Sequence, residues 1–150
     1  MASLVGSRVE RKEDKKFLTG KGRYTSDINL LHQTYAYFVR SPHARAKIVK
    51  VDIEKALKSP GVVNIFTGDD IAKEKIGGLI AGWKIVSQDG KDMKVPNHPP
   101  LAKNSVNYVG DHVAVVIAET LENAKNAADL VNVSYKVLKA VVDPGDAINS

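Results

Sequence analysis

The chain has 150 residues, of which 43% are hydrophobic and 26% are charged, and this length suits one ordinary globular core. The absence of cysteine excludes a disulfide, a thiolate nucleophile and an iron–sulfur cluster built from the chain's own residues. No apolar run approaches the roughly 20 residues that a membrane helix needs, and the first four residues lack the charged-then-apolar pattern of a secretory signal. We therefore expect a soluble, cytoplasmic protein with one domain and no membrane contact.

A formal net charge of +5 at pH 7 is compatible with a polyanionic partner, because lysine and arginine side chains release counterions from phosphates. The charges are poorly segregated, however. The most basic region, residues 8–23, is interleaved with the acids Glu10, Glu13 and Asp14. Nucleic-acid surfaces usually carry basic residues on one face with few acids among them, so the sequence favours a solvated or partner-facing region.

Residues 1–25 show no sustained periodicity and end in a glycine-rich turn, so we expect an extended N-terminal arm. The Gly20-Lys-Gly22 element invites comparison with a phosphate-binding loop. That loop needs a glycine five residues before its Gly-Lys pair, where this chain has Lys15. A dinucleotide-binding fingerprint fails too, because its third glycine falls on Thr25 and no strong strand precedes it. The turn is interpreted as structural.

Three strands are predicted in the first half of the chain. Residues 34–39 are rich in aromatic and β-branched side chains, which favour a strand. Residues 46–51 and 62–66 predict two more strands, separated by a short helix over residues 53–58 with Asp52 as its N-cap. Residues 46–66 therefore form a small strand–helix–strand unit.

A second short helix and a long loop follow. Thr67 and Asp70 have the spacing of a capping box, which predicts a helix to about Lys75. From Ile76 to Asn107 glycines and prolines recur without a lasting period, apart from a tight turn expected at residues 88–90. Loops of this length are commonly functional or held by something outside them.

The strongest pattern runs from Tyr108 to Val137. Residues 113–118 are six consecutive apolar residues, which predict a central strand covered on both faces. Thr120 is the expected N-cap of a helix with one apolar face. That face consists of Leu121, Ala124, Ala127, Ala128 and Val131. From Val131 the apolar residues alternate with polar ones, so we expect one face of the next strand to be exposed to solvent.

The predicted fold class is α+β. Its two strand–helix–strand units, residues 46–66 and 113–137, are expected to share one mixed sheet. Residues 143–148 look like a helix about to begin, which suggests that the chain is cut from a longer one.

The sequence offers few reactive constellations. The histidines are spread singly, without the helical spacing of metal ligands: His32, His43, His98 and His112. Asp111 and His112 are neighbours, so on a strand their side chains point to opposite faces and the carboxylate is badly placed to orient the imidazole.

Other candidates have simpler interpretations. Ser41 and His43 lie close in sequence, but a hydrolase also needs an oxyanion hole and an orienting acid. Trp83, Tyr35 and Tyr37 could stack on a ligand ring, but such aromatic residues more often fill a core. We therefore predict no catalytic, cofactor-binding or metal-binding residue in this chain.

Four stretches, in order along nearly the full length, resemble the N-terminal α/β hammerhead domain of the molybdenum-binding large subunit of the xanthine dehydrogenase, aldehyde oxidase and carbon monoxide dehydrogenase family. The stretches are Val5-Gly-Ser-Arg-Val-Glu-Arg-Lys-Glu-Asp14 with Phe17-Leu-Thr-Gly-Lys-Gly-Arg-Tyr-Thr25; Arg40-Ser-Pro-His-Ala-Arg45; Pro60-Gly-Val-Val63 with Phe66-Thr-Gly-Asp-Asp70; and Pro100-Leu-Ala102 with Tyr108-Val-Gly-Asp-His-Val-Ala114 through Ala140-Val-Val-Asp-Pro144. The opening stretch is most similar to carbon monoxide dehydrogenase large chains.

The resemblance implies an arm over residues 1–25, a hammerhead domain over residues 26–143 and the start of a linker at residues 144–150. It places molybdopterin and the catalytic glutamate in a downstream continuation, so this chain alone binds no cofactor. His112 stands where relatives often have proline, and it does not substitute for the catalytic glutamate or for a cofactor-binding residue. The implied role is a structural and interface domain of an oxidoreductase that oxidises carbon monoxide, an aldehyde or a purine, with FAD and iron–sulfur subunits as further partners.

Two alternatives stay open from the residues alone. One is a stand-alone α/β binding module that uses the loop at residues 76–107 for its own ligand. The less favoured alternative is a basic nucleic-acid-binding domain.

Overall fold

The computed structural model describes residues 5–80, 82–83 and 85–148. The first four residues of the predicted arm, positions 81 and 84 of the predicted loop and the last two residues of the predicted linker lie outside the described residues. The chain divides into two compact units, one up to Gln33 and one from Thr34 onward. Among the described residues, no helix is long and apolar enough to cross a membrane.

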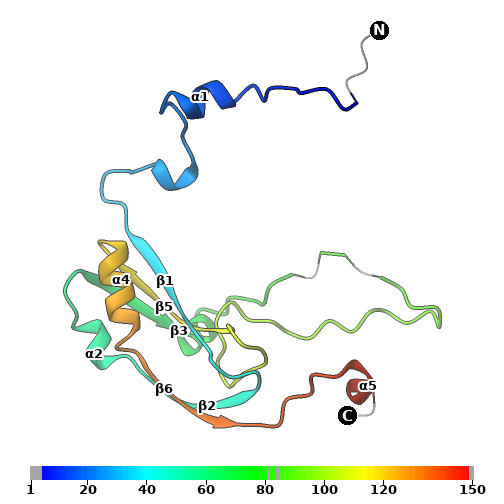
Figure 1. The fold of residues 1–150 in the computed structure, drawn as a ribbon. Helices are drawn as coiled ribbons and strands as arrows, with labels where there is room; N and C mark the ends of the chain where they lie inside the picture. The colour runs from blue at the N-terminus through cyan, green and yellow to red at the C-terminus, as the bar shows by residue number, and fades with distance from the viewer. Residues whose placement is uncertain (1–4, 81, 84, 149–150) are drawn as a thin grey trace. The chain divides into compact units, whose positions relative to one another are not determined.

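Figure 1 shows the elements in chain order. They are α1 (Asp14–Leu18), the 3-10 helix η1 (Thr25–Asp27), β1 (Tyr35–Arg40), β2 (Ala46–Asp52), α2 (Glu54–Leu57), β3 (Val62–Thr67), α3 (Gly68–Lys73), β4 (Ser105–Val106), β5 (His112–Ala118), α4 (Leu121–Ala128), β6 (Asn132–Val137) and α5 (Pro144–Ile148).

The first unit contains short local structure. The Phe17 and Tyr24 rings stack with their centroids 5.3 Å apart. The Tyr24 amide donates a hydrogen bond of 2.8 Å to the Asp27 carboxylate. The prediction of an extended arm over residues 1–25 is therefore wrong at α1, because helical backbone bonds and the ring pair fold this part of the chain.

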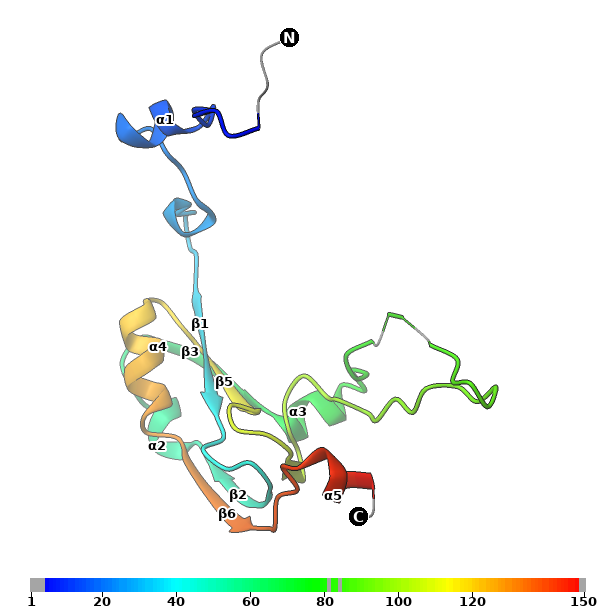
Figure 2. The same cartoon turned by 45° about the vertical axis from the view of Figure 1, so that its right-hand side comes forward.

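β5 is the central strand of an antiparallel sheet with the order β1-β5-β3, which confirms its predicted central position. α4 contacts all three strands and lies along one side of them (Figure 2). Alternate β5 residues, Ala114, Val116 and Ala118, form a core with Ile65 of β3 and the buried alanines of α4. The fully apolar run is thus buried most completely on its helix side.

The second sheet has the order β4-β2-β6 and is also antiparallel. Its inner side chains, which include Ile48 and Tyr135, pack against a second core that contains Val106 of β4 and Val113 of β5. Its outer side chains include Lys47 of β2, which lies directly opposite Lys136 of β6. The predicted solvent-exposed face of β6 is confirmed by the exposure of its polar residues.

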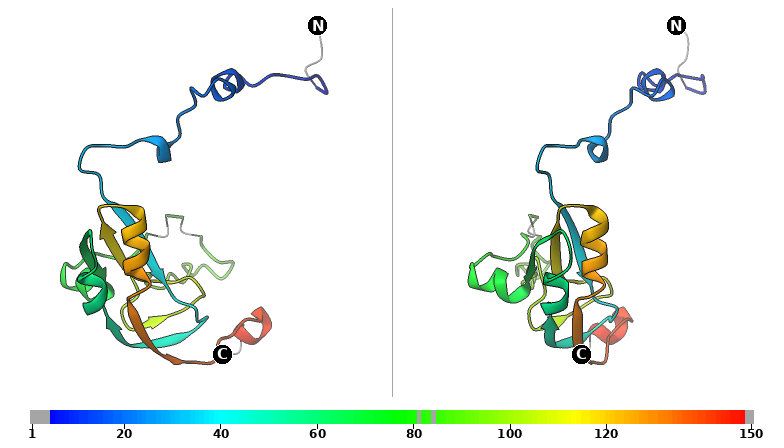
Figure 3. Two further views of the ribbon diagram at one scale, coloured as in Figure 1. Left: turned by 60° about the vertical axis from the view of Figure 1, so that its left-hand side comes forward. Right: turned by 90° about the vertical axis from the view of Figure 1, so that its left-hand side faces the viewer.

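The prediction that the two strand–helix–strand units share one mixed sheet is wrong. β2 and β6 belong to one sheet, while β3 and β5 belong to the other, and every pairing is antiparallel. A parallel crossover needs a connection of about a dozen or more residues, whereas β2 and β3 are joined only by residues 53–61. Each short helix therefore carries the chain from one sheet to the other (Figure 3), and the α+β class itself is confirmed.

α4 packs through small side chains. The Asn123 amide donates a hydrogen bond of 3.1 Å to Thr120 Oγ1, which confirms the predicted N-cap. Ala124, Ala127 and Ala128 are buried against the sheet. Leu121 is 44% exposed, so its predicted place on the buried face is wrong. Helical side chains tilt toward the helix N-terminus, and in the first turn this direction leads past the end of the packed surface.

The loop from Ile76 to Asn107 is closed near its base. The Leu79 amide donates a hydrogen bond of 2.7 Å to the His98 carbonyl. Below this bond, a Cβ at Gly68 would overlap the Ala102 carbonyl oxygen. Lys103 Nζ lies 3.1 Å from Asp69 Oδ1. Two segments that leave and rejoin the domain are therefore fastened to each other (Figure 1).

The tip of the loop contains the predicted turn. Gly90 has a φ of +77° and its amide donates a hydrogen bond of 2.9 Å to the Ser87 carbonyl. An isolated bridge joins Val86 to Asp92. β4 was not predicted within this loop, because a strand of 2 residues is too short to show a period.

Candidate functional site

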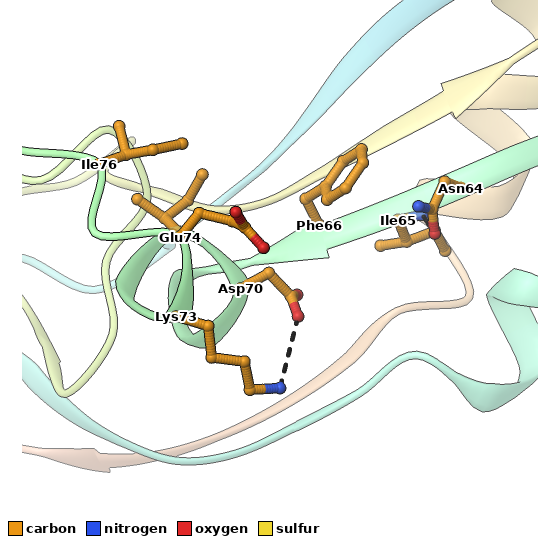
Figure 4. A pocket seen from close by; sticks show the side chains of 8 residues that line it. Asn64, Ile65, Phe66, Asp70, Lys73, Glu74 and Ile76 are labelled. Carbon is orange, nitrogen blue, oxygen red and sulfur yellow. Dashed lines mark hydrogen bonds and ion pairs between the residues drawn. The ribbon is translucent and has the colours of Figure 1, made fainter.

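A hollow of about 410 Å³ lies between β3 and α3 (Figure 4). Its lining residues are Asn64, Ile65, Phe66, Asp70, Ile71, Lys73, Glu74 and Ile76. Phe66, Ile71 and Ile76 supply an apolar surface. The charged side chains beside it are Asp70 and Lys73 of α3 and Glu74, which directly follows α3. Concave apolar surfaces with a few polar groups are typical of binding sites.

The capping box at the start of α3 positions one of these charged side chains. Asp70 Oδ2 accepts hydrogen bonds of 2.8 Å from the Thr67 amide and 2.7 Å from the Thr67 hydroxyl. This geometry confirms the predicted box and explains why α3 begins directly after β3. The hydrogen bonds to Thr67 lower the pKa of Asp70, so its carboxylate remains ionised at neutral pH.

The rim of the hollow carries a net negative charge. Asp70 Oδ1 lies 3.8 Å from Lys73 Nζ, which is a weak pairing at the protein surface. Glu74 lies on the same rim, and within the described part of the chain its carboxylate has no ion-pair partner. Two carboxylates and one ammonium group therefore border the apolar surface, and only Asp70 is directed toward Lys73 (Figure 4).

This arrangement favours binding over proton transfer. An ionised Asp70, held by two hydrogen bonds, has no proton to donate at neutral pH. No serine, threonine or histidine lines the hollow to act as a nucleophile or base. The hollow instead offers an apolar surface with a neighbouring negative charge.

Ser41 and Asp111 are the buried polar side chains that the structure describes, and both bond to the backbone. Ser41 Oγ accepts a hydrogen bond of 3.0 Å from the His43 amide and lies 3.1 Å from the His43 carbonyl. Asp111 Oδ2 accepts one of 3.0 Å from the Asn107 amide. The His43 ring packs edge-on against Tyr135 at 5.0 Å, so Ser41 and His43 form a structural turn rather than a nucleophile–base pair.

The remaining histidines lie in separate places. His112 stacks on Phe38 with ring centroids 4.5 Å apart. His98 Nε2 lies 3.1 Å from the Tyr108 hydroxyl. His32 belongs to the first unit and has a φ of +60°. Across residues 5–80, 82–83 and 85–148, no three His, Asp or Glu side chains come together as potential metal ligands.

His112 combines partial burial with a nearby positive charge. Desolvation is the main cause that lowers its pKa, and the Arg40 guanidinium lowers it further. Arg40 itself donates a hydrogen bond of 3.2 Å to the Gly110 carbonyl. The neutral imidazole on Phe38 is therefore a packing group at neutral pH.

The aromatic candidates fare differently. Tyr35 and Tyr37 lie on β1, opposite Ala118 and Val116 of the core. Trp83 is 83% exposed, so the expectation that it fills a core is wrong. It lies in the long loop, between α3 and β4.

Sequence reasoning missed the hollow. It assigned Phe66 to a strand and the α3 residues to a helix, both correctly, without expecting the two elements to leave a space between them. The available signal was that the strand ends at Thr67 and the helix begins at the next residue, Gly68. Such a sharp turn leaves apolar side chains on both arms facing the same side.

Comparison with known proteins identifies the domain. Residues 19–139 match the family described as aldehyde oxidase and xanthine dehydrogenase, a/b hammerhead domain. The nicotine 6-hydroxylase large subunit of Paenarthrobacter nicotinovorans is 39% identical over 97% of this chain and 17% of its own length. The carbon monoxide dehydrogenase large chain of Afipia carboxidovorans is 33% identical over 96% of this chain and 16% of its own.

A solved structure agrees with these matches. Quinoline 2-oxidoreductase from Pseudomonas putida 86 has a TM-score of 0.82 and 35% sequence identity, over 95% of this chain and 17% of its own. The chain thus spans about a sixth of the length of its large-subunit relatives. It belongs to the aldehyde oxidase and xanthine dehydrogenase a/b hammerhead domain family.

Proposed function

We propose that the chain is a structural and interface domain of a molybdenum hydroxylase large subunit and carries no reaction chemistry itself. The observation that supports this most directly is the use of its polar groups. Ser41, Asp111 and Asp70 hydrogen-bond to backbone or capping groups, and none of these three side chains belongs to a nucleophile–base pair. A domain built this way contributes shape and contact surface to a larger enzyme.

The relatives support a role away from the substrate. They are named for nicotine, quinoline and carbon monoxide, which share little chemistry, yet the same domain is similar in all three. A domain that contacted the reacting molecule would be expected to change with it. The substrate of the whole enzyme, whether carbon monoxide, an aldehyde, a purine or a ring such as nicotine, would then be selected elsewhere.

The hollow beside α3 does not fit molybdopterin. That cofactor carries phosphate, which needs positive charge or converging backbone amides. The hollow beside α3 has two carboxylates and one lysine on its rim, a charge balance that repels an anion. The cofactor is therefore assigned to the part of a large subunit that this chain does not span.

Companion subunits follow from the same assignment. The P. nicotinovorans relative that is 33% identical over 96% of this chain is named as subunit gamma of a dehydrogenase complex. FAD and iron–sulfur subunits are the expected partners of the whole enzyme, in the cytoplasm and without nucleic acid. A stand-alone module that binds a ligand through residues 76–107 is not favoured, because the family match covers residues 19–139 of a domain found within large subunits.

A domain exchange tests the proposal. Residues 1–150 replace the matching segment of the nicotine 6-hydroxylase large subunit, and nicotine oxidation is measured after assembly with that enzyme's other subunits. We expect the chimera to keep the host's substrate preference and a rate within about tenfold of the host, since a tenfold loss corresponds to about 1.4 kcal/mol.

The isolated chain provides the complementary measurement. Mixed with an electron acceptor, it should oxidise neither carbon monoxide, an aldehyde nor nicotine. Turnover by the isolated chain would contradict the proposal. So would a chimera that assembles with its cofactors yet follows a new substrate preference.

A further inference from the structure

The β1-β5-β3 sheet has one covered face and one open face. α4 lies against the side that carries Ala114, Val116 and Ala118 of β5 (Figures 2 and 3). Side chains alternate along a strand, so Val115 and Ile117 point to the other side. On that side α3 lies at the β3 edge, where Ile71 and Phe66 line the same hollow.

The strand register extends this open face across all three strands. Phe38 of β1 and Phe66 of β3 both lie opposite Val115, so these three side chains form one row. Ala36 of β1 and Asn64 of β3 lie opposite Ile117 and form a second row. The open face is therefore defined by Ala36, Phe38, Asn64, Phe66, Val115 and Ile117.

The exposure of its two phenylalanines shows that this face is only partly covered, although His112 stacks on Phe38. Phe38 and Phe66 are each 39% exposed, whereas Val116, between them on the opposite side, is 0% exposed. Large side chains on the inner face of a covered sheet are normally buried, and contiguous exposed apolar surface marks an interaction site. Five of the six side chains are apolar, so contact with water is costly here.

The hollow continues the open face at its β3 edge. Phe66 belongs to both, and Ile71 and Ile76 extend the apolar surface beyond the strand. Glu74 adds a carboxylate without an ion-pair partner in the described part of the chain. This local negative charge contrasts with the formal net charge of +5 of the whole chain.

We infer that the open face and its hollow are the docking surface for the rest of the large-subunit polypeptide, through a segment that places an apolar side chain in the hollow and a lysine or arginine beside Glu74. The inference rests on the proposed function and adds which surface is used and what chemistry it meets. Two observations support this occupant: the chain spans only 17% of its relative's length, and the rim complements a positive charge.

The absence of cysteine from the chain allows a direct test by thiol labelling. Ala36→Cys puts one thiol on the open face, and the control Ser134→Cys puts one on the exposed, outer side of β6. Each variant is made in the isolated chain and in the complete large subunit, and labelled peptides are identified by mass spectrometry.

In the isolated chain both thiols should react at similar rates. In the complete large subunit the Ala36→Cys thiol should react at least about tenfold more slowly, while the Ser134→Cys thiol changes by less than about threefold, since thiol reactivity follows exposure. Addition of Glu74→Lys should restore fast labelling of Ala36→Cys. The matched change Glu122→Lys, on exposed α4 surface, should not.

The outcomes separate the two proposals. Fast labelling of Ala36→Cys in an assembled, active large subunit overturns the docking surface and leaves the proposed function standing. Protection of Ala36→Cys in the isolated chain, with a dimer in solution, overturns it in favour of a second copy. A reading frame that stops at Ser150 overturns the proposed function and this inference together.

Discussion

The helix α4 with its sheet and the loop at residues 76–107 both contain many apolar residues, yet they have opposite surroundings. Ala124 and Val116 are fully buried, whereas Trp83 and Ile80 are almost fully exposed. In the first region the apolar residues recur with the period of a helix or strand, so they lie on one face of each element and pack together. In the second no period exists, and apolar side chains stay in water unless another molecule covers them. Periodicity, more than composition, separates core from contact surface here.

Enlarging a buried alanine should give the largest effect and would test how tightly the first region is packed. Ala124→Leu adds three carbons where α4 lies on the sheet, so we expect a loss of about 2–3 kcal/mol in the free energy of unfolding. Urea titration followed by circular dichroism measures it. Asn126→Leu, on the exposed side of the same helix, should change it by less than about 0.5 kcal/mol. Equal losses would mean that α4 is not packed as described.

The next effect concerns the junction between the two regions. Gly68→Ala should cost about 1–2 kcal/mol, because its Cβ would overlap the Ala102 carbonyl oxygen and the backbone must shift. Gly77→Ala, at the start of the loop, has open space around the added Cβ and should be nearly neutral. Thermal unfolding of the two variants compares them directly. A neutral Gly68→Ala would show that the loop base is not fastened there.

The capping box should have an intermediate effect that depends on pH. Asp70→Asn removes a carboxylate that accepts two hydrogen bonds from Thr67, at a cost of about 0.5–1 kcal/mol near pH 7. Because folding lowers the pKa of Asp70, its contribution is present above the ordinary value of about 4 and is lost as the pH falls through the lower folded value. The difference between wild type and Asp70→Asn should therefore shrink below about pH 4. A constant difference would contradict this linkage.

A smaller pH effect is expected from His112. Folding lowers its pKa through desolvation and the Arg40 charge, so stability is fully present above the ordinary value of about 6.5 and falls as the pH drops through the window between the two values. His112→Phe should flatten the stability profile between about pH 5 and 7. His32→Asn, in the other unit, should leave it unchanged. Denaturant midpoints at several pH values give both profiles.

The smallest effect should come from the loop itself. Trp83→Ala removes the largest side chain in the chain but one that is 83% exposed, so we expect a change below about 0.5 kcal/mol in the free energy of unfolding of the isolated chain. Circular dichroism is the suitable probe, since the only tryptophan is lost. A loss above about 1 kcal/mol would show that the loop folds onto the domain and would remove the contrast between the two regions.

Local sequence patterns predicted most strands and helices, because the signals that favour each element lie within its own residues. The apolar run of β5, the cap at Thr120 and the box at Thr67 act over a few residues and were recognised. The pairing partners of most strands were not recognised, because pairing depends on where each connecting helix places the next strand. α2 is too short to bring β3 back beside β2, and this geometry decided the two-sheet arrangement.

The candidate site was harder to anticipate than the fold. Its apolar residues come from a strand and a helix with different periods, so no single pattern contains Phe66, Ile71 and Ile76 together. The open face depends on the register of three strands. That register places Ala36 opposite Ile117, 81 positions further along the chain, and only folding brings the two together. Family resemblance, by contrast, needed only short ordered motifs, and the match over residues 19–139 confirmed it.

The fastening of the loop base has a consequence for how this domain can vary. The bond between Leu79 and His98 and the ion pair between Asp69 and Lys103 hold the loop's two ends together, independently of what lies between them. The intervening segment can then be lengthened, shortened or exchanged at a modest entropic cost that grows only slowly with its length. Changes in the length or sequence of this segment should therefore leave the two sheets and their helices intact.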